Sequence, residues 1–309
     1  MYNQNLTKFI DKYLIHCEVE KGLTTKTLKA YKIDLQQFSD YISQRQVECN
    51  KETLQDYLVF LNKKYKVKSV KRKLASLKAF FSYLEYEELL NQNPFSRLRI
   101  KLHEPSILPR TIPFTTVEVL LKCAYQQKSF VKRDTYSFRA IVRDIAVLEL
   151  LFASGMRVSE ICSLHTDSIN LSDGTLKIFG KGSKERIMQI GNEAVLDAIR
   201  TYHNVFSDEI TSWGYFFINR LGNPLSDQSV RCMINRYVSL AGIEMHITPH
   251  MFRHSFATLL LEEDVDIRYI QHLLGHSSIV TTQIYTHVTS KKQRDILAQK
   301  HPRNKIEVE

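Results

Sequence analysis

The stretch TPHMFRHSFATLLLEED, residues 248–264, combines a helix-forming pattern with side chains that a helix core avoids. Thr248 followed by Pro249 predicts a helix start, because a hydroxyl can cap the first turn and proline lacks only an N–H group that would be unpaired there. The phenylalanines and leucines that follow have the spacing of one buried face. His250 and Arg253 lie about 60° apart around the helix axis, so both side chains can reach the same group.

Two other segments place ionisable side chains next to a turn. In ASGMRVSEICSLH, Arg157 follows a glycine, and Glu160 stands at the i+3 position, where its carboxylate can hold the guanidinium. In HLLGHSSIVTTQIYTHV, a glycine typical of helix ends precedes His276, and Tyr285 lies on the next predicted helix. Each segment also has a simpler interpretation: a surface ion pair for the first and a buried tyrosine for the second.

The histidines raise the alternative of a metal site, because His250 and His254, and again His272 and His276, stand four residues apart. The metalloprotease pattern has a glutamate directly after its first histidine, whereas this chain has a methionine there. No acidic residue follows nearby in the sequence before Glu262. We therefore predict no metal site and no cofactor.

The composition indicates a polyanionic partner. Over 309 residues, 43 Lys and Arg stand against 33 Asp and Glu, which gives a formal net charge of +10 and an isoelectric point of about 9.2. Such an excess favours nucleic acid over an acidic membrane surface. No apolar run has membrane-spanning length, and the first residues do not form a signal peptide. The five scattered cysteines fit a reducing compartment, so we expect a cytoplasmic protein without membrane association.

Residues 1–99 predict a domain of short helices, because apolar positions recur with helical spacing in four segments. Within it, seven basic residues and no acidic residue lie between Lys63 and Lys73. The run leads into and opens a helix, where side chains and N-terminal amides can both bind phosphate. We therefore predict DNA contact rather than a merely solvated face. The predicted DNA-contacting residues are Thr25, Lys26, Lys68, Ser69, Lys71, Arg72 and Lys73.

Three prolines between residues 100 and 113 predict an extended linker, and residues 114–309 form the predicted second domain. Residues 140–151 are strongly apolar and predict a buried helix, whereas residues 126–138 are polar, poorly periodic and predict a surface loop or insertion. TLKIFGKGSKERIMQI predicts two strands around a Gly-Lys-Gly turn. The predicted fold is mainly α, with a helical amino-terminal domain and a mixed α/β domain that contains a small antiparallel sheet.

Together these motifs resemble the tyrosine recombinase, or phage integrase, family, and most closely its Xer branch. The matching residues are Arg157 in SGMRVSE, Lys181 in GKGSKER, His250 and Arg253 in TPHMFRHSFAT, His276 in LLGHSS and Tyr285 in TTQIYTHV. GLTTKTLKAYKIDLQQF and SVKRKLASLKAFFSYL are similar to the family's SAM-like core-binding domain, and KHPR resembles Xer tails. The resemblance covers nearly the whole chain and implies a core-binding domain followed by a catalytic domain.

The resemblance implies strand cleavage through a covalent 3′-phosphotyrosine at Tyr285. A tyrosine hydroxyl titrates near 10 and needs a base, for which His250 is the predicted residue. Lys181 is the predicted general acid for the leaving 5′-oxygen. Because the phosphotyrosine conserves the bond energy, the 5′-hydroxyl of another strand can attack it, and neither a metal nor nucleotide hydrolysis is needed.

A phosphodiester is an anion that gains charge in the transition state. Arg157 and Arg253 are therefore expected to donate to its non-bridging oxygens, with Glu160 supporting Arg157. His276 is expected to hydrogen-bond the phosphate. The resemblance also implies a tetrameric synapse on two double-stranded DNA recombination sites, in which the carboxy-terminal helix docks on the neighbouring subunit. A second, different recombinase is an additional partner that the sequence leaves open.

Three other functions are alternatives at this point. A type IB topoisomerase forms the same covalent adduct but works as a monomer, a non-enzymatic DNA-binding protein would use only the basic helices, and a metal-dependent nuclease would use the histidines. The sequence also leaves open whether the natural role is the resolution of chromosome dimers or the movement of a genetic element.

Overall fold

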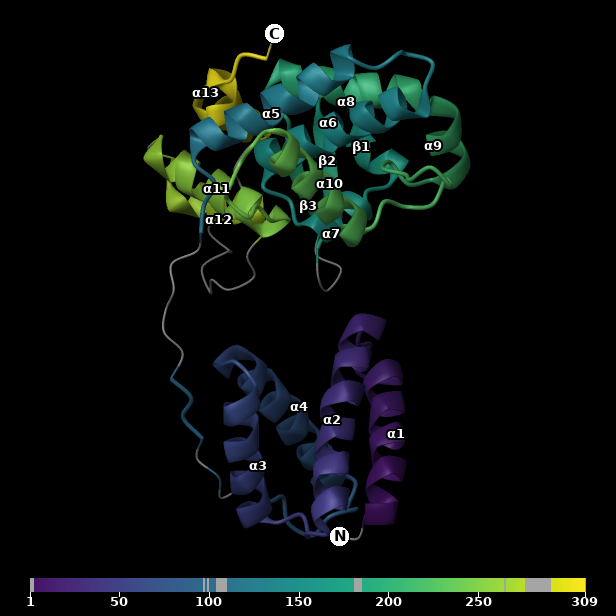
Figure 1. Cartoon of the computed structure of the whole chain (residues 1–309), viewed down its shortest axis with the longest axis vertical. Coiled ribbons are helices and arrows are strands. Elements are labelled where there is room, and N and C mark those ends of the chain that lie inside the picture. Colours follow the sequence, from purple (N-terminus) through teal and green to yellow (C-terminus); the bar gives the residue numbers. More distant parts are fainter. Residues whose placement is uncertain are drawn as a thin grey trace. The chain divides into compact units, whose positions relative to one another are not determined.

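The computed structural model describes residues 3–96, 98, 100–103, 110–180, 185–263, 265–275 and 290–308. The chain divides into two compact units, Met1–Ile107 and Leu108–Glu309 (Figure 1). Among the helices within the described ranges, none has the length and the apolar run needed to cross a bilayer. All five cysteines are free thiols.

The described residues of the first unit form four helices, coloured purple to blue in Figure 1, and this confirms the predicted helical domain. They are α1 Asn3–Val19, α2 Thr25–Arg45, α3 Lys51–Lys64 and α4 Val67–Tyr86. The side chains of Thr24 and Asn50 cap α2 and α3 by accepting N–H groups of the first turn. The core is aromatic, since Phe38 packs edge to face against Tyr57 and Phe81.

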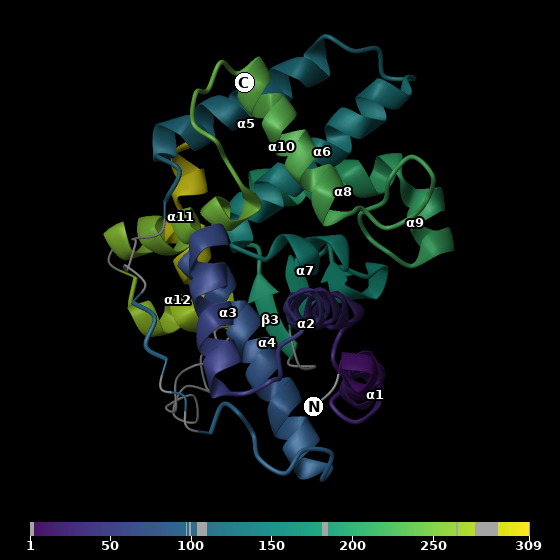
Figure 2. The same cartoon turned by 60° about the horizontal axis from the view of Figure 1, so that its bottom comes forward.

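The second unit contains the remaining helices and a small sheet. Its helices are α5 Phe114–Ser129, α6 Tyr136–Ser154, α7 Val158–Cys162, α8 Glu193–Val205, α9 Ser207–Trp213, α10 Asp227–Leu240, α11 Pro249–Glu262, α12 Ile267–Leu274 and α13 Ser290–Lys300. Two short 3-10 turns, Thr166–Ser168 and Pro302–Lys305, complete the described elements. α11 and α12 lie side by side on one flank of this unit (Figure 1, Figure 2).

Helix α6 runs through the core of the second unit, which explains why its second half is buried on all sides. Thr135 caps its first turn, and Gly155 ends it in the left-handed region at φ 58°. A side chain at position 155 would come within 2.7 Å of the ring of Phe256 on α11. Glycine therefore lets α11 pack against the turn from which Arg157 starts α7.

The sheet has three antiparallel strands in the order β1 Ile169–Asn170, β2 Thr175–Phe179 and β3 Glu185–Gln189, which confirms the predicted hairpin. Leu176 pairs with Met188, and Ile178 pairs with Arg186. Because side chains alternate along a strand, these four residues share the face that packs on the core. Arg186 therefore points the same way as apolar core residues.

Two local predictions fail. The expected surface loop over residues 126–138 is wrong for most of its length, because α5 continues to Ser129 and α6 begins at Tyr136. The last turn of α5 lies near the surface, where a helix needs no apolar periodicity. Helix α11 starts at Pro249 as predicted, but within the described residues the hydroxyl of Thr248 makes no capping hydrogen bond.

Candidate active site

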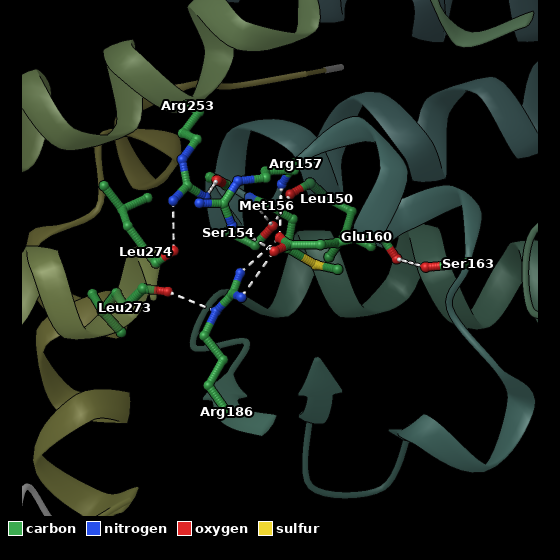
Figure 3. A network of polar contacts seen from close by, with 11 residues as sticks. Leu150, Ser154, Met156, Arg157, Glu160, Ser163, Arg186, Arg253, Leu273 and Leu274 are labelled. Carbon is green, nitrogen blue, oxygen red and sulfur yellow. Dashed lines mark hydrogen bonds and ion pairs between the residues drawn. The ribbon is translucent and has the colours of Figure 1, made fainter. Parts of the chain in front are cut away.

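Arg157 and Glu160 are joined at the start of α7, as their spacing predicted (Figure 3). The Oε2 atom of Glu160 accepts the backbone N–H of Arg157 at 2.9 Å, and Oε1 accepts Nη1 of the same arginine at 2.8 Å. The carboxylate thereby satisfies an unpaired N–H group of the helix start and holds the guanidinium at once. The Arg157 side chain remains 37% exposed, so part of its guanidinium faces outward.

The carboxylate of Glu160 is also held by Arg186, a residue that the sequence reasoning missed. Arg186 donates from Nη1 to Oε1 at 3.0 Å and from Nη2 to Oε2 at 2.8 Å, the parallel geometry of a bidentate pair. Its Nε donates to the carbonyl of Leu273 at 3.0 Å. The one available signal was strand alternation, which puts an arginine on the same face as Met188.

Arg253 comes from α11 and is nearly enclosed, with 5% of the residue exposed. It donates from Nη1 to the carbonyl of Gly155 at 2.8 Å and from Nη2 to the carbonyl of Leu274 at 2.5 Å. The guanidinium thus ties the end of α6 to the last turn of α12, whose carbonyls lack helical partners. The phenylalanines of α11 are buried below it, as the sequence pattern predicted.

The cluster carries an excess of fixed positive charge. Within the described residues, the guanidinium groups of Arg157 and Arg186 bond the carboxylate of Glu160, and that of Arg253 lies next to that of Arg157 (Figure 3). Burial, together with the charge of Arg157, lowers the pKa of Arg253 to about 10. Burial by itself would raise the pKa of Glu160, but its bonds to Arg186 and Arg157 outweigh this and leave the pKa below its usual value. Such a site is built to receive an anion.

His250 lies on the first turn of α11 and is exposed, in contrast to the enclosed Arg253. His254, one turn further, is also exposed. Burial and the neighbouring charges of His250 and Arg253 lower the pKa of His254. Helix α11 therefore presents two imidazole groups to solvent, one turn apart.

Three predicted site residues, Lys181, His276 and Tyr285, lie outside the described residues. For two of them, described residues close by in the sequence belong to the cluster. Strand β3 begins four residues after Lys181 and contributes Arg186, and α12 ends at Leu274, with Gly275 as its cap directly before His276. Gly275 is left-handed at φ 63°, and a side chain there would lie 3.1 Å from the Arg186 side chain.

The predicted DNA-contacting residues divide into two groups by exposure. Thr25, Lys26, Lys68, Lys71 and Arg72 are exposed at the starts of α2 and α4, and Ser69 is half-buried.

Lys73 differs from these residues, because it is only 3% exposed and its ammonium is committed inside the unit. Its Nζ donates to Asp34 at 2.9 Å and to Gln37 at 2.5 Å, and it lies 4.8 Å from the centre of the Tyr65 ring. Arg72 pairs with the same buried aspartate. Asp34 thus fixes the basic end of α4 to α2.

The chain matches known proteins over both units. The phage integrase family model matches residues 126–292, and the N-terminal SAM-like domain of phage integrases matches residues 10–88. A tyrosine recombinase of Agathobacter rectalis is 54% identical over 300 residues, which cover 97% of this chain and 98% of the relative. Tyrosine recombinase XerC of Thermodesulfovibrio yellowstonii is 35% identical over 311 residues, which cover 97% of this chain and 98% of the relative.

A solved structure shares the fold. The XerH site-specific recombinase bound to its difH substrate, in a pre-cleavage complex, superposes with a TM-score of 0.66 at 22% sequence identity. The match covers 92% of this chain and 82% of that one.

The family models and the relatives therefore place the chain among enzymes that cleave and rejoin DNA strands, and its second unit is mainly helical. The chain belongs to the phage integrase family, the tyrosine recombinases, which cleave and rejoin DNA strands in recombination. This confirms the fold class and the function that the sequence motifs predicted.

Proposed function

We propose that this chain is a Xer-like site-specific recombinase that acts on double-stranded DNA through a covalent 3′-phosphotyrosine at Tyr285. The observation that carries the proposal is the cluster of Arg157, Arg186 and Arg253 around the carboxylate of Glu160. A scissile phosphate there would meet donors that are already aimed, of which Arg253 is nearly enclosed. Such donors act on the charge that develops in the transition state without having to reorganise.

The proposed cleavage step exchanges one phosphoester bond for another. The phenolic oxygen of Tyr285 bonds to phosphorus while the bond from phosphorus to the 5′-oxygen breaks. The phenol proton passes to His250, which is exposed on α11, and the leaving oxygen takes a proton from Lys181. In the reverse step a free 5′-hydroxyl from another strand attacks the phosphotyrosine. Since the bond energy is conserved, the proposed reaction needs no metal and no cofactor.

Arg157 and Arg253 are proposed to bind the non-bridging oxygens of the phosphate, with His276 as a further donor. Among the described residues only Nη1 of Arg157 has a side-chain partner, so its other nitrogens remain for a ligand. Each terminal nitrogen of Arg253 carries two N–H groups and uses one for a carbonyl. The backbone carbonyls thus aim the Arg253 fork without consuming all its donors.

A nicked suicide duplex in EDTA tests the proposal, because the short strand released after cleavage diffuses away and the adduct accumulates. We expect a denaturation-resistant protein–DNA adduct with the wild-type chain and none with Tyr285→Phe. A metal-dependent nuclease would be inactive in EDTA, and a non-enzymatic DNA-binding protein would give no cleavage. A type IB topoisomerase would form the adduct as a monomer, without assembling on paired sites.

The exposed basic ends of α2 and α4 are proposed to bind the DNA backbone through Thr25, Lys26, Lys68, Ser69, Lys71 and Arg72. Lys73 belongs to the same proposal in a different role. Its ammonium is bonded to Asp34 and Gln37, so it would orient α4 against α2 rather than contact phosphate directly. Thiols that are all free are compatible with work in the reducing cytoplasm.

Self-association into a tetramer is proposed to use the carboxy-terminal segment, whose described contacts are within its own chain. Leu297 of α13 is buried, and a side chain at Gly191, just after β3, would come within 2.6 Å of the Ala298 backbone. Beyond α13, Arg303 is 1% exposed and pairs with Glu149 of α6 at 2.5 and 2.6 Å.

The buried pair constrains how a neighbour could take up this segment. Removing one partner of a buried ion pair costs about 3–5 kcal/mol, because the other charge is left uncompensated. We therefore propose a reciprocal exchange, in which the Glu149 of each subunit receives an Arg303 from another copy. Cross-linking of a cysteine pair at positions 149 and 303 on paired DNA sites tests this. Bonds between subunits are expected, and bonds within single chains only would contradict exchange.

The trapped adduct identifies the DNA site. It also tests whether a second recombinase shares the tetramer. Sequencing the DNA recovered with it distinguishes a chromosomal resolution site from the ends of a mobile element. If the tetramer contains only copies of this chain, this chain by itself is expected to form adducts at both DNA sites.

A further inference from the structure

Arg186 joins three segments that the chain brings together from distant positions (Figure 3). It stands on β3, bonds both oxygens of Glu160 on α7, and bonds the carbonyl of Leu273 in the last turn of α12. Its side chain is 10% exposed, so these bonds form away from competing water. Within the described residues, no other side chain of the cluster forms hydrogen bonds both to Glu160 of α7 and to a carbonyl of α12.

The carboxylate of Glu160 is fully used by this arrangement. Each oxygen accepts two hydrogen bonds: Oε1 from Nη1 of Arg157 and Nη1 of Arg186, and Oε2 from the Arg157 backbone and Nη2 of Arg186. A carboxylate has about four acceptor positions, so none is left over. Because Arg186 takes two of them, Arg157 is held by one side-chain nitrogen only and keeps its other donors.

The geometry requires arginine at position 186. A guanidinium has a planar fork that spans two carboxylate oxygens while Nε points elsewhere, whereas a lysine ammonium is a single point. Lysine at this position would have to give up the Leu273 carbonyl or one Glu160 oxygen. Loss of a Glu160 bond would free that carboxylate to pair bidentately with Arg157. Loss of the Leu273 bond would loosen the turn at Gly275 that packs against Arg186.

We propose that Arg186 is a positioning residue for the strand-cleavage reaction. It occupies half of the Glu160 carboxylate and so keeps Arg157 turned toward the phosphate, and it locks the last turn of α12 onto the same carboxylate. The inference rests on the proposed function, since it assigns Arg157 to the scissile phosphate. Arg186 itself needs no contact with DNA in this role.

The test compares Arg186→Lys with Arg200→Lys in the full-length chain. Arg200 is a matched control, because it also bonds a carbonyl, that of Leu171, and carboxylates, those of Glu193 and Asp197 on its own helix α8, away from the cluster. We expect Arg186→Lys to slow single-turnover adduct formation by about 10- to 100-fold, as small misplacements of a catalytic group do, with DNA affinity nearly unchanged. Arg200→Lys should keep the wild-type rate.

A double-mutant cycle separates positioning from general stability. If Arg186 acts through Arg157, then Arg186→Lys in an Arg157→Ala background causes little further loss of rate. A full additional 10- to 100-fold loss in that background would overturn the proposal, and so would equal losses in Arg186→Lys and Arg200→Lys. Melting curves taken alongside show whether each variant is folded at the assay temperature.

If Arg186→Lys fails to fold, Glu160→Gln breaks the same link from the other side. It is expected to slow cleavage and, in an Arg157→Ala background, to cause little further loss of rate; a full additional loss there would contradict the proposal. The outcome is separable from the proposed function. A wild-type chain that forms no adduct refutes that function, whereas normal cleavage by a folded Arg186→Lys refutes only the positioning role.

Discussion

Replacing Arg253 by lysine separates its two jobs, holding the backbone and binding phosphate. Both terminal nitrogens of Arg253 are bonded to buried carbonyls, at 2.8 Å to Gly155 and 2.5 Å to Leu274. A lysine ammonium cannot span both, so at least one charged hydrogen bond is lost, at about 1.5–3 kcal/mol. For a unit of this size, each kcal/mol corresponds to about 2–4 °C in Tm, which gives a fall of roughly 3–12 °C.

The effect of Arg253→Lys on catalysis should be larger than its effect on stability. Losing a pre-organised donor to the transition state costs about 3–4 kcal/mol, or roughly a hundred- to thousand-fold in rate. DNA affinity should fall by less than about tenfold, because one phosphate contact among many makes a small part of the total. The assay is single-turnover adduct formation on a suicide duplex, well below the Tm of the variant, with binding measured separately.

Arg139→Lys serves as the control for Arg253→Lys. Arg139 also donates to a partly buried backbone carbonyl, that of Val205, and it pairs with Glu209, but it lies outside the arginine cluster. It should lower Tm and leave the cleavage rate unchanged. Should Arg253→Lys lose affinity as steeply as rate, the arginine only anchors the complex. An unchanged Tm would contradict the two carbonyl bonds.

Three further predictions follow from single contacts. The pKa of Glu160 is lower in the folded chain than its usual 4.5. Its charge therefore stabilises the fold fully above pH 4.5, and this contribution is lost as pH falls through the lowered pKa. Glu160→Gln should flatten the acid limb of a curve of unfolding free energy against pH, and an unchanged limb would contradict the network. Glu149→Gln leaves Arg303 buried without its partner and should cost about 3–5 kcal/mol in urea unfolding, whereas a loss below about 1 kcal/mol would mean that the tail is not docked there. Changing both Lys68 and Lys71 to glutamine should reduce the slope of log affinity against log salt by about 0.9 for each lost phosphate contact, whereas Lys132→Gln should leave the slope unchanged. The same slope in the wild-type chain, the double variant and Lys132→Gln would show that the start of α4 does not contact DNA.

Local patterns along the sequence were enough to predict the first unit and the central elements of the second. The four helices of the first unit and the β2–β3 hairpin each bury one repeating set of side chains, and α6 carries a continuous apolar run; both signals are visible locally. The last turn of α5 escaped prediction because it lies near solvent and carries no such repeat. Arg157 with Glu160 was predictable for a related reason, since both partners lie within one turn.

Contacts between distant segments were not predictable in this way. Lys73 belongs to a basic run that looks solvated, but Asp34 on another helix draws it inside. Arg303 sits in a charged tail, yet Glu149, within an apolar helix, needs a partner there. Arg186 bonds a carboxylate and a backbone carbonyl that are both remote in sequence, and backbone carbonyls carry no residue-type signal at all.

The most direct test of the account is the chemical identity of the DNA-bound residue. The wild-type chain is reacted with a suicide duplex, digested with protease and nuclease, and examined by tandem mass spectrometry. The account predicts a nucleotide phosphate esterified to the hydroxyl of Tyr285, and none in Tyr285→Phe. An adduct on another residue, or cleaved DNA with no adduct at position 285, would contradict it.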